Sequence, residues 1–361
     1  MIKNDVGGFE DYLAKHAKLV NDKLNEVLTK ETSTHYIENL LGRSNYEYDN
    51  KAIDKSILDP AWYLMSLGGK RWRPVMMGLV IEALGKKEED YREFLLIPEV
   101  IHNGTLVHDD IEDGSPMRRG SPSVHVKYGV DIGINLGDFM YYFPVVALID
   151  TKKLSIETKN KAINIYVREM LRVCVGQATD IAWHNELVDP YSVGEQKYLQ
   201  MAYNKTGVLP RMAAKLGAII AEADDDTVEA LGNFGATIGV AFQIQDDIMN
   251  ITKSHVAETK GGVGDDITEG KITLMVIHAL GNANKDDSKR LIDILKIHTR
   301  EKKLIDEAIA IIERYDGNAY ARKLADKLII EAWKEIDKRL PETEAKRRLK
   351  QLADYMVSRK E

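Results

Sequence analysis

LVHDDIEDGSPMRRG, residues 106–120, places four acidic side chains within five residues and follows them with a Gly-Ser-Pro turn and two arginines. If the preceding apolar run is helical, Asp109 and Asp113 lie one turn apart on one face, because residues i and i+4 are neighbours on a helix. Like charges at that spacing repel, so such a helix end needs either full solvation or a cation. The stretch is therefore either a solvated surface or a Mg²⁺ site. In a Mg²⁺ site, water and a substrate phosphate would complete the coordination, and Arg118 and Arg119 would hold the same phosphate.

The composition predicts a sizeable core and excludes several classes of function. The 361 residues are 44% hydrophobic and carry a net charge of −7, which disfavours a nucleic-acid partner and gives no polybasic face for anionic lipid. The single cysteine, Cys174, excludes an intrachain disulfide and predicts a reducing, cytoplasmic location. The N-terminus lacks the apolar segment of a signal peptide. The most apolar window, 139–149, is too short to cross a bilayer, so we expect no membrane span.

The dominant hydrophobic period is helical, and the chain shows no convincing alternating strand. We therefore predict an all-α protein whose residues 1–361 form a single domain, in which residues 1–50 could be an N-terminal helical extension. A polar link is expected at 45–59, and start signals resembling a capping box occur at Ser192 with Glu195 and at Asp226 with Glu229. Helices are expected over about 9–30, 60–68, 74–84, 131–149 and 155–185, with a further helix that carries the opening motif.

TVEALGNFGATIGVAFQIQDDIMN, residues 227–250, is a second helix with an acidic end. Its glycines, Gly232, Gly235 and Gly239, weaken a helix by up to about 1 kcal/mol each relative to alanine. Close helix packing is their expected use, and shaping a ligand pocket is the alternative. Further on, Gln243, Asp246 and Asn250 fall on one face. If the two acidic ends face one another across a bundle, their aspartates need divalent cations, and a bound diphosphate would complete the coordination.

Basic residues occur in three other segments. GGKRWRP (68–74) sets three cations beside a glycine pair and a proline suited to a helix start. KTG (205–207) interrupts a helical region, and GGVGDDITEGK (261–271) is a glycine-rich loop that ends in a lysine. Each segment alone is equally compatible with solvated or flexible chain, so only their combination indicates an anion site.

In order along the chain, these segments resemble the trans-isoprenyl diphosphate synthases, the head-to-tail prenyltransferases that include farnesyl and geranylgeranyl diphosphate synthases. The resemblance runs through GGKRWRP (68–74), HNGTLVHDDIEDGSPMRRG (102–120), NKTG (204–207), FQIQDDIMN (242–250) and GDDITEGKITL (264–274). It implies a large antiparallel helical bundle around a deep central cavity, assembled as a homodimer. The implied substrates are isopentenyl diphosphate and an allylic diphosphate (dimethylallyl, geranyl or farnesyl), and the implied cofactor is Mg²⁺, three ions per active site with diphosphate bound.

The resemblance also implies a role for each matching residue. Asp109 and Asp113 would bind Mg²⁺ on the allylic diphosphate with Asp110 in support, and Asp246 with Asp247 would do so from the second motif. The proton lost in the reaction would go to the released diphosphate, so His102 is expected to bind substrate and not to act as a base. Arg118, Lys205 and Lys271 are expected on the allylic diphosphate, Lys70, Arg73, His102 and Arg119 on isopentenyl diphosphate, and Thr206 and Gln243 near the developing carbocation.

Two positions depart from the family pattern. The second motif usually reads DDxxD, but its last position here is Asn250, which keeps an oxygen and loses a charge. Since Asp246 is the more important ligand, we expect Mg²⁺ binding to survive. The family has Gly-Lys-Pro before the GxDIxEGK segment, whereas this chain has Lys260 followed by two glycines. We expect Lys260 to reach the diphosphate from its shifted position.

Product length is predicted from residues just before the first motif. In the family, positions four, five and eight before it line the elongation pocket, and an aromatic ring there stops the chain early. These are Thr105, Gly104 and Ile101 in this sequence, so we expect a product of twenty carbons or more.

Two other classes stay open as alternatives. A class I terpene cyclase shares the fold and the aspartate motif, but needs no isopentenyl diphosphate site. A non-catalytic subunit of a heteromeric prenyltransferase would typically lose an aspartate motif, whereas here only the position of Asn250 differs.

Overall fold

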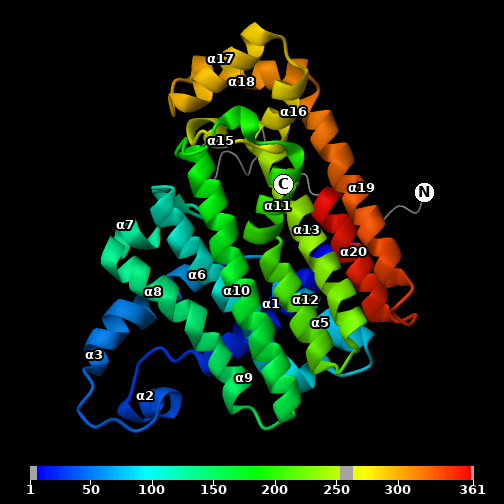
Figure 1. The fold of residues 1–361 in the computed structure, drawn as a ribbon. Helices are drawn as coiled ribbons and strands as arrows, with labels where there is room; N and C mark the ends of the chain where they lie inside the picture. Colours follow the sequence, from blue (N-terminus) through cyan, green and yellow to red (C-terminus); the bar gives the residue numbers. More distant parts are fainter. Residues whose placement is uncertain (1–5, 253–262, 359–361) are drawn as a thin grey trace.

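Every regular element in the described residues, 6–252 and 263–358 of the computed structural model, is helical except for one short hairpin (Figure 1). The all-α prediction is therefore confirmed, and the predicted helices are present with their ends shifted by a few residues. The first part of the chain forms α1 (Val6–Val27), α2 (Thr34–Leu41), α3 (Asn50–Ile53), α4 (Asp59–Ser66), α5 (Trp72–Ala83), α6 (Arg92–Glu112), β1 (Met117–Arg118), β2 (Ser121–Pro122), α7 (Val124–Tyr128), α8 (Val130–Tyr142) and α9 (Val146–Asp150).

The second part of the chain completes the bundle. Its elements are α10 (Ile156–His184), α11 (Glu195–Lys205), α12 (Val208–Ile220), α13 (Asp225–Ile251), α15 (Asp265–Thr268), α16 (Leu274–Asn282), α17 (Lys285–Lys296), α18 (Lys302–Arg314), α19 (Gly317–Asp337) and α20 (Glu344–Ser358).

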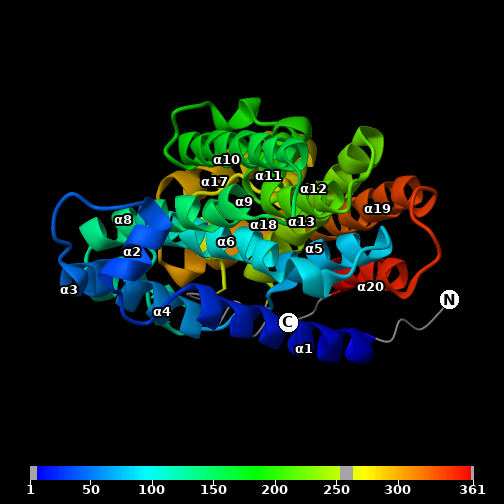
Figure 2. The same ribbon diagram turned by 90° about the horizontal axis from the view of Figure 1, so that it is seen from below.

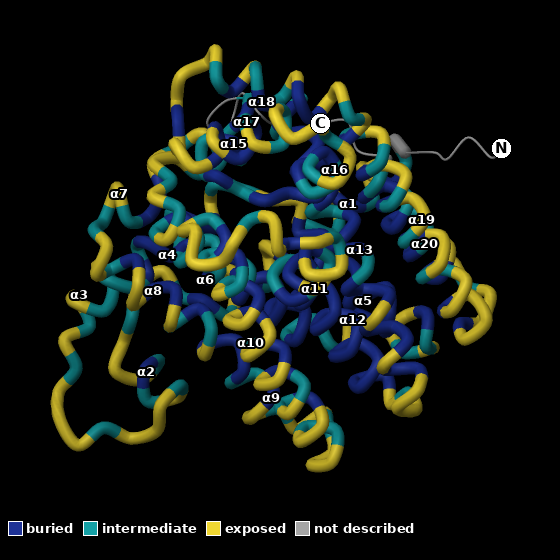
Figure 3. Tube along the Cα trace, turned by 45° about the horizontal axis from the view of Figure 1, so that its top comes forward, coloured by how far each residue is buried: buried dark blue, intermediate teal, exposed yellow. Residues whose placement is uncertain are grey.

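Helices α5 and α12 form the centre of the molecule. Every residue of α12 is buried, and α5 exposes only Glu82. The two helices pack against each other, while α6, α10 and α13 pack against α12, which places the most apolar helices inside (Figure 3). The terminal helices α1 and α20 lie against each other and against α5, along one side of the bundle (Figure 2). Phe9 and Leu13 of α1 are buried in the same core as α5.

The predicted polar link at 45–59 is wrong in its second half. Helix α3 begins at Asn50, continues through a π-helical turn (Asp54–Leu58) and leads directly into α4. The Asp49 carboxylate caps this helix by accepting a hydrogen bond from the Ala52 N–H at 3.0 Å. Polar composition is misleading here because the segment lies on the surface, where a helix exposes polar residues on one face.

The predicted capping box at Ser192 and Glu195 is also wrong, although α11 does begin at Glu195. The cap position is Gly194, and the Ser192 hydroxyl instead donates to the carbonyl of Asp189 at 2.7 Å. The Glu195 carboxylate accepts a hydrogen bond from the Tyr320 hydroxyl of α19. A tertiary contact therefore uses the side chain that the local pattern assigns to the cap.

The start of α13 lies slightly before the predicted signal. The Asp224 carboxylate accepts from the Thr227 N–H at 2.8 Å, so Asp224 is the cap and Asp226 belongs to the first turn. Acidic residues in that turn stabilise the positive end of the helix dipole.

The glycines of α13 allow close packing, as predicted. A carbon added at Gly235 would lie 2.5 Å from the carbonyl oxygen of Pro210, and one at Gly239 would lie 2.5 Å from Cα of Gly207. Both distances are shorter than any van der Waals contact, so backbone meets backbone at these points. The contact at Gly207 also fixes the break between α11 and α12, which carries Lys205 and Thr206.

One stretch in the described residues, Val130–Asp150, is long and apolar enough to cross a membrane by length and composition. It is longer than the window 139–149 considered in the sequence, because α8 and α9 follow each other with only a 3₁₀ turn between them. Nearly half of its most apolar window is buried inside the bundle, as in a core helix.

We predict that Gly235→Ala lowers the free energy of unfolding by about 1–3 kcal/mol, because overpacking against the Pro210 carbonyl exceeds the gain in helix propensity. Gly281→Ala on α16 is the control, since a carbon added there has no atom within 4 Å. Denaturant titration of both variants measures the difference. Equal stability of the two would contradict the close-packing account.

Candidate active site

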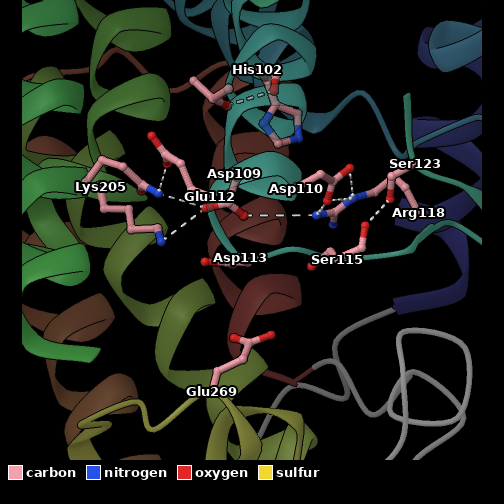
Figure 4. A network of polar contacts seen from close by, with 12 residues as sticks. His102, Asp109, Asp110, Glu112, Asp113, Ser115, Arg118, Ser123, Lys205 and Glu269 are labelled. Atoms are coloured by element: carbon pink, nitrogen blue, oxygen red, sulfur yellow. Dashed lines mark hydrogen bonds and ion pairs between the residues drawn. The ribbon is translucent and has the colours of Figure 1, made fainter. Parts of the chain in front are cut away.

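The end of α6 and the β1–β2 hairpin form one wall of a cavity of about 840 Å³ (Figure 4). The Asp113 N–H donates to the Asp109 carbonyl at 2.9 Å, so the two aspartates are one helical turn apart, as predicted. The hairpin turns the chain back so that Arg118 reaches the helix end. Its Nε donates to the Asp110 carboxylate at 2.9 Å, and Nη2 lies 4.0 Å from Asp109. The buried Asp110 therefore holds the arginine beside the other two carboxylates.

Lys205, the last residue of α11, reaches the same acidic group from another helix. Its Nζ lies 3.2 Å from Asp109 and 2.5 Å from Asp180 of α10. One turn before Asp180, the Gln177 amide donates to Glu112 at 2.6 Å and to Asp109 at 3.2 Å. Helix α10 thus supplies two polar side chains that orient the first motif and its lysine.

Lys271 approaches from the segment after α15. Its Nζ lies 3.7 Å from Asp113 and 3.7 Å from Asp266, and it forms a closer ion pair with Glu269. Two lysines and Arg118 therefore surround the aspartates of the first motif.

The opposite wall comes from α13, where Gln243, Asp246 and Asp247 line the cavity. Gln243 donates to Asp247 at 2.6 Å and accepts from the Thr206 hydroxyl at 2.6 Å. The Tyr198 hydroxyl donates to the second oxygen of Asp247 at 2.7 Å. Both carboxylate oxygens of Asp247 therefore accept hydrogen bonds from protein side chains.

Asn250, the departure from the DDxxD pattern, has a structural use. Its side-chain oxygen accepts from the Asp266 N–H at 3.1 Å, and its carbonyl accepts from the Gly264 N–H at 2.9 Å. Both contacts tie the end of α13 to the segment that carries Lys271. An amide oxygen can make this contact without adding another negative charge beside Asp247.

A second group of cations lies in the same cavity, around the start of α5. It contains Lys70, Arg73, His102 and Arg119. Arg71, which also borders the cavity, has a left-handed backbone (φ 49°). Its guanidinium donates at 2.6 Å to the buried Glu99 of α6, which anchors the loop. The Arg119 guanidinium donates to the carbonyl of Gly68, so it helps to hold the same loop.

Burial and charge set the protonation of these groups. Burial raises the pKa of Asp109, but Lys205, Lys271 and Arg118 outweigh this effect and lower it to about 2. For Asp113, burial prevails over the opposing pull of Lys271 and raises the pKa to about 7. Burial, followed by the nearby charge of Asp266, raises the pKa of Asp247 to about 8.

The basic group is affected in the opposite direction. Burial, reinforced by Arg73 and Arg119, lowers the pKa of His102 well below its ordinary value. Burial also lowers the pKa of Arg73 to about 10. His102 is therefore neutral at physiological pH and can donate one N–H to an anion, while the arginines keep their charge.

Most of the residues predicted from the sequence meet in this one cavity. Asp110 is buried just behind its wall, and Lys260 lies outside the described residues. Those that line the cavity are Lys70, Arg73, His102, Thr105, Asp109, Asp113, Arg118, Arg119, Lys205, Thr206, Gln243, Asp246, Asp247 and Lys271.

Of the three positions predicted to set product length, Thr105 lines the cavity, whereas Ile101 and Gly104 are buried behind it. A carbon added at Gly104 would lie 3.0 Å from Cβ of Met140 and 3.2 Å from the ring of Tyr141. Gly104 therefore allows α8 to approach α6 closely, which brings Tyr141 to the cavity wall. The role of these positions in product length stays a prediction.

The sequence interpretation missed several side chains of the site: Gln177, Asp180, Tyr198 and Asp266. The first two lie one turn apart on a long amphipathic helix, and polar residues on such a helix are usually solvent-exposed. The sequence did contain one signal for them: Gln177 and Asp180 form a polar pair at i and i+3 on an otherwise buried face.

The donor set fits Mg²⁺ shared with a diphosphate. In residues 6–252 and 263–358, no three His, Cys, Asp or Glu side chains are arranged to hold a metal ion by themselves. Mg²⁺ usually takes one or two carboxylates together with substrate phosphate and water. Asp109 and Asp113 on one wall and Asp246 on the other are placed to supply those carboxylates.

The sequence profile of the polyprenyl synthetase family matches residues 54–312. The chain belongs to this family. It is 35% identical over 305 residues to a short chain isoprenyl diphosphate synthase of Methanothermobacter thermautotrophicus, covering 84% of this chain and 91% of the relative. It is 34% identical over 331 residues to a geranylgeranyl diphosphate synthase of Saccharolobus solfataricus, covering 90% and 97%.

A solved structure agrees with this membership of the polyprenyl synthetase family. The crystal structure of a geranylgeranyl pyrophosphate synthetase from Pyrococcus horikoshii superposes with a TM-score of 0.83 at 30% identity, covering 98% of this chain and 99% of that one. The family resemblance inferred from the motifs is thus confirmed.

We predict that the metal-free protein becomes more stable when the pH is lowered from 8.5 to 6.5. The folded pKa values of Asp113 and Asp247, about 7 and 8, lie above the ordinary value of 3.8, so the folded state binds more protons than the unfolded state over this interval. Protonation should add about 1–3 kcal/mol. Mg²⁺ competes with these protons and should therefore raise the melting temperature more at pH 8.5 than at pH 6.5.

Thermal denaturation in EDTA and in MgCl₂ at the two pH values measures both effects. Asp113→Asn serves as the comparison, because it removes one of the two titrating carboxylates and should weaken the pH dependence. A metal-free protein whose stability rises with pH across this interval would contradict the account.

Proposed function

We propose that the protein is a head-to-tail prenyltransferase that condenses isopentenyl diphosphate with an allylic diphosphate to give a trans-polyprenyl diphosphate. The observation that carries the proposal is the presence of two separate cationic groups in one cavity. Arg118, Lys205 and Lys271 surround the first aspartate motif, whereas Lys70, Arg73, His102 and Arg119 line the cavity around the start of α5. Two anion sites fit a reaction between two diphosphate substrates. A terpene cyclase, the alternative, binds one diphosphate substrate and needs only one such site.

In this proposal the allylic diphosphate leaves its carbon while bound by Lys205, Lys271 and Arg118. These groups stabilise the negative charge that grows on the leaving group in a cavity with little water. When bound, Mg²⁺, three ions per site, would neutralise more of that charge from Asp109, Asp113 and Asp246, with Asp110 and Asp247 in support.

The carbocation left behind needs oxygen atoms nearby and a partner alkene in position. Thr206 and Gln243, hydrogen-bonded to each other at 2.6 Å, present polar oxygens on the cavity wall. Arg73, Arg119 and the neutral His102 hold isopentenyl diphosphate so that its double bond can attack. The proton lost afterwards passes to the released diphosphate, so the protein supplies no general base.

The presence of Asp109, Asp113, Asp246 and both cationic groups supports an active synthase over a non-catalytic subunit. We further propose a cytoplasmic homodimer with no nucleic-acid partner. Exposed apolar side chains gathered on two helices support the dimer, because exposed apolar patches commonly mark protein–protein contacts. These side chains are Ile134 and Tyr142 on α8 and Val167, Leu171 and Val175 on α10.

We predict that Asp109→Asn reduces kcat by at least about 100-fold, a loss typical of removing one stabilising charge from a transition state. Arg119→Ala should mainly raise the Michaelis constant for isopentenyl diphosphate. Steady-state kinetics with farnesyl diphosphate as primer distinguishes the two effects, and Tyr46→Ala, at a position that is 87% exposed and does not line the cavity, is the control. Turnover that is unchanged in Asp109→Asn, or independent of isopentenyl diphosphate, would refute the proposed function.

We propose a product of twenty carbons or more, with geranylgeranyl diphosphate the first expectation. The geranylgeranyl diphosphate synthases among the relatives support this length. Helices α6 and α8 run antiparallel, with His108 beside Gly137 and Gly104 beside Tyr141. Tyr141 therefore lies at the level of Gly104, five residues before Asp109, or about 7 Å along the helix axis. A prenyl chain growing away from the aspartates passes its ring.

We predict that Tyr141→Ala shifts the product distribution to longer chains by at least one isoprene unit, since the ring no longer narrows the cavity. The wild-type protein should extend farnesyl diphosphate to twenty carbons or more. Chromatography of dephosphorylated products measures both, with Tyr46→Ala, an exposed tyrosine outside the cavity, as the control. Predominantly fifteen-carbon product from the wild type would contradict the proposed length.

A further inference from the structure

The cationic group at the start of α5 receives one contact from the far end of the chain. The Lys70 Nζ donates a hydrogen bond to the Tyr355 hydroxyl of α20 at 2.6 Å, and the same ammonium lies 5.2 Å from the centre of the ring. Tyr355 is 4% exposed, and its ring packs against Phe9 of α1 with centroids 5.8 Å apart. A buried residue of the last helix therefore binds an exposed lysine of the substrate cavity.

The backbone around Lys70 makes this contact informative. Gly68, Gly69 and Arg71 all have positive φ values, so Lys70 lies in an irregular loop and not on a helix that would direct its side chain. The loop itself is anchored: Arg71 donates to Glu99 at 2.6 Å and to Asn21 of α1 at 3.1 Å. The anchored backbone does not by itself determine where the Lys70 ammonium lies, because the side chain has four rotatable bonds.

Fixing a lysine side chain costs rotamer entropy, and anion binding must offset this cost if the lysine is free in the unbound protein. A tyrosine hydroxyl that accepts one N–H already restricts the lysine side chain. Part of the entropy cost is therefore met before the anion binds. The ammonium has three N–H donors, so two remain for a phosphate oxygen. A neutral hydroxyl does this without competing for the charge, whereas a carboxylate in its place would neutralise the lysine.

We propose that Tyr355 is a positioning residue for isopentenyl diphosphate, acting through Lys70, and that it makes the packing of α20 and α1 a condition for binding this substrate. The inference rests on the proposed function, since it assigns Lys70 to the isopentenyl diphosphate site. Tyr355 lies away from the first aspartate motif and its lysines, so the allylic substrate should be unaffected.

Tyr355→Phe tests the proposal, because it removes the hydroxyl and keeps the ring that packs on Phe9. We expect the Michaelis constant for isopentenyl diphosphate to rise roughly three- to tenfold, which corresponds to the net contribution of one typical hydrogen bond. The Michaelis constant for the allylic substrate, kcat and the melting temperature should stay at wild-type values. Tyr320→Phe on α19, which removes another tyrosine hydroxyl bond far from the cavity, is the matched control and should change none of these constants.

A double-mutant cycle separates positioning from a structural role. In a Lys70→Ala background, Tyr355→Phe should have no further effect on the Michaelis constant, because the hydroxyl then has no ammonium to hold. Effects that multiply in the double variant would overturn the proposal, as would an unchanged constant in Tyr355→Phe. A lower constant would also overturn it, because Tyr355 would then be holding Lys70 away from the substrate. If the wild type does not consume isopentenyl diphosphate at all, the proposed function itself fails.

Discussion

Carboxylates that face one another across a partly buried cavity repel, and this repulsion is the constraint on which the rest of the site depends. The protein meets it with positive side chains from distant segments: Arg118 from the hairpin, Lys205 from the end of α11 and Lys271 from the segment after α15. The same cations and aspartates that balance each other are the groups a magnesium diphosphate requires. The balance differs from one carboxylate to the next: nearby cations lower the pKa of Asp109, whereas burial prevails and raises the pKa of Asp113.

Helix packing holds these segments at fixed positions relative to one another. Close packing of α13 on the start of α12, through Gly235 and Gly239, fixes the helix break that follows Lys205. Asn250 ties the end of α13 to the segment of Lys271. Gly235, Gly239 and Asn250 are therefore the points where α13 meets the segments that carry Lys205 and Lys271.

The sequence predicted the fold class and most of the site because the relevant signals are local. Helical periodicity and the DDIED and QDD motifs depend on neighbours a few residues apart. Failures occurred where a distant partner decides the outcome. Glu195 is engaged by Tyr320 and not by a local cap, Gly104 faces α8 and not the cavity, and Asp180 became a site residue only because α11 brings Lys205 to it.

The central claim is that the cavity holds two diphosphates, one on each cationic group, with divalent cations between the aspartate motifs. Diffraction from crystals grown with Mn²⁺, isopentenyl diphosphate and an unreactive thio-analogue of farnesyl diphosphate tests it most directly. The account predicts anomalous peaks beside Asp109 and Asp113 and beside Asp246, one diphosphate on Lys205, Lys271 and Arg118, and a second on Lys70, Arg73, His102 and Arg119. A single bound diphosphate, or manganese away from these aspartates with Lys205 still paired to Asp109, would contradict it.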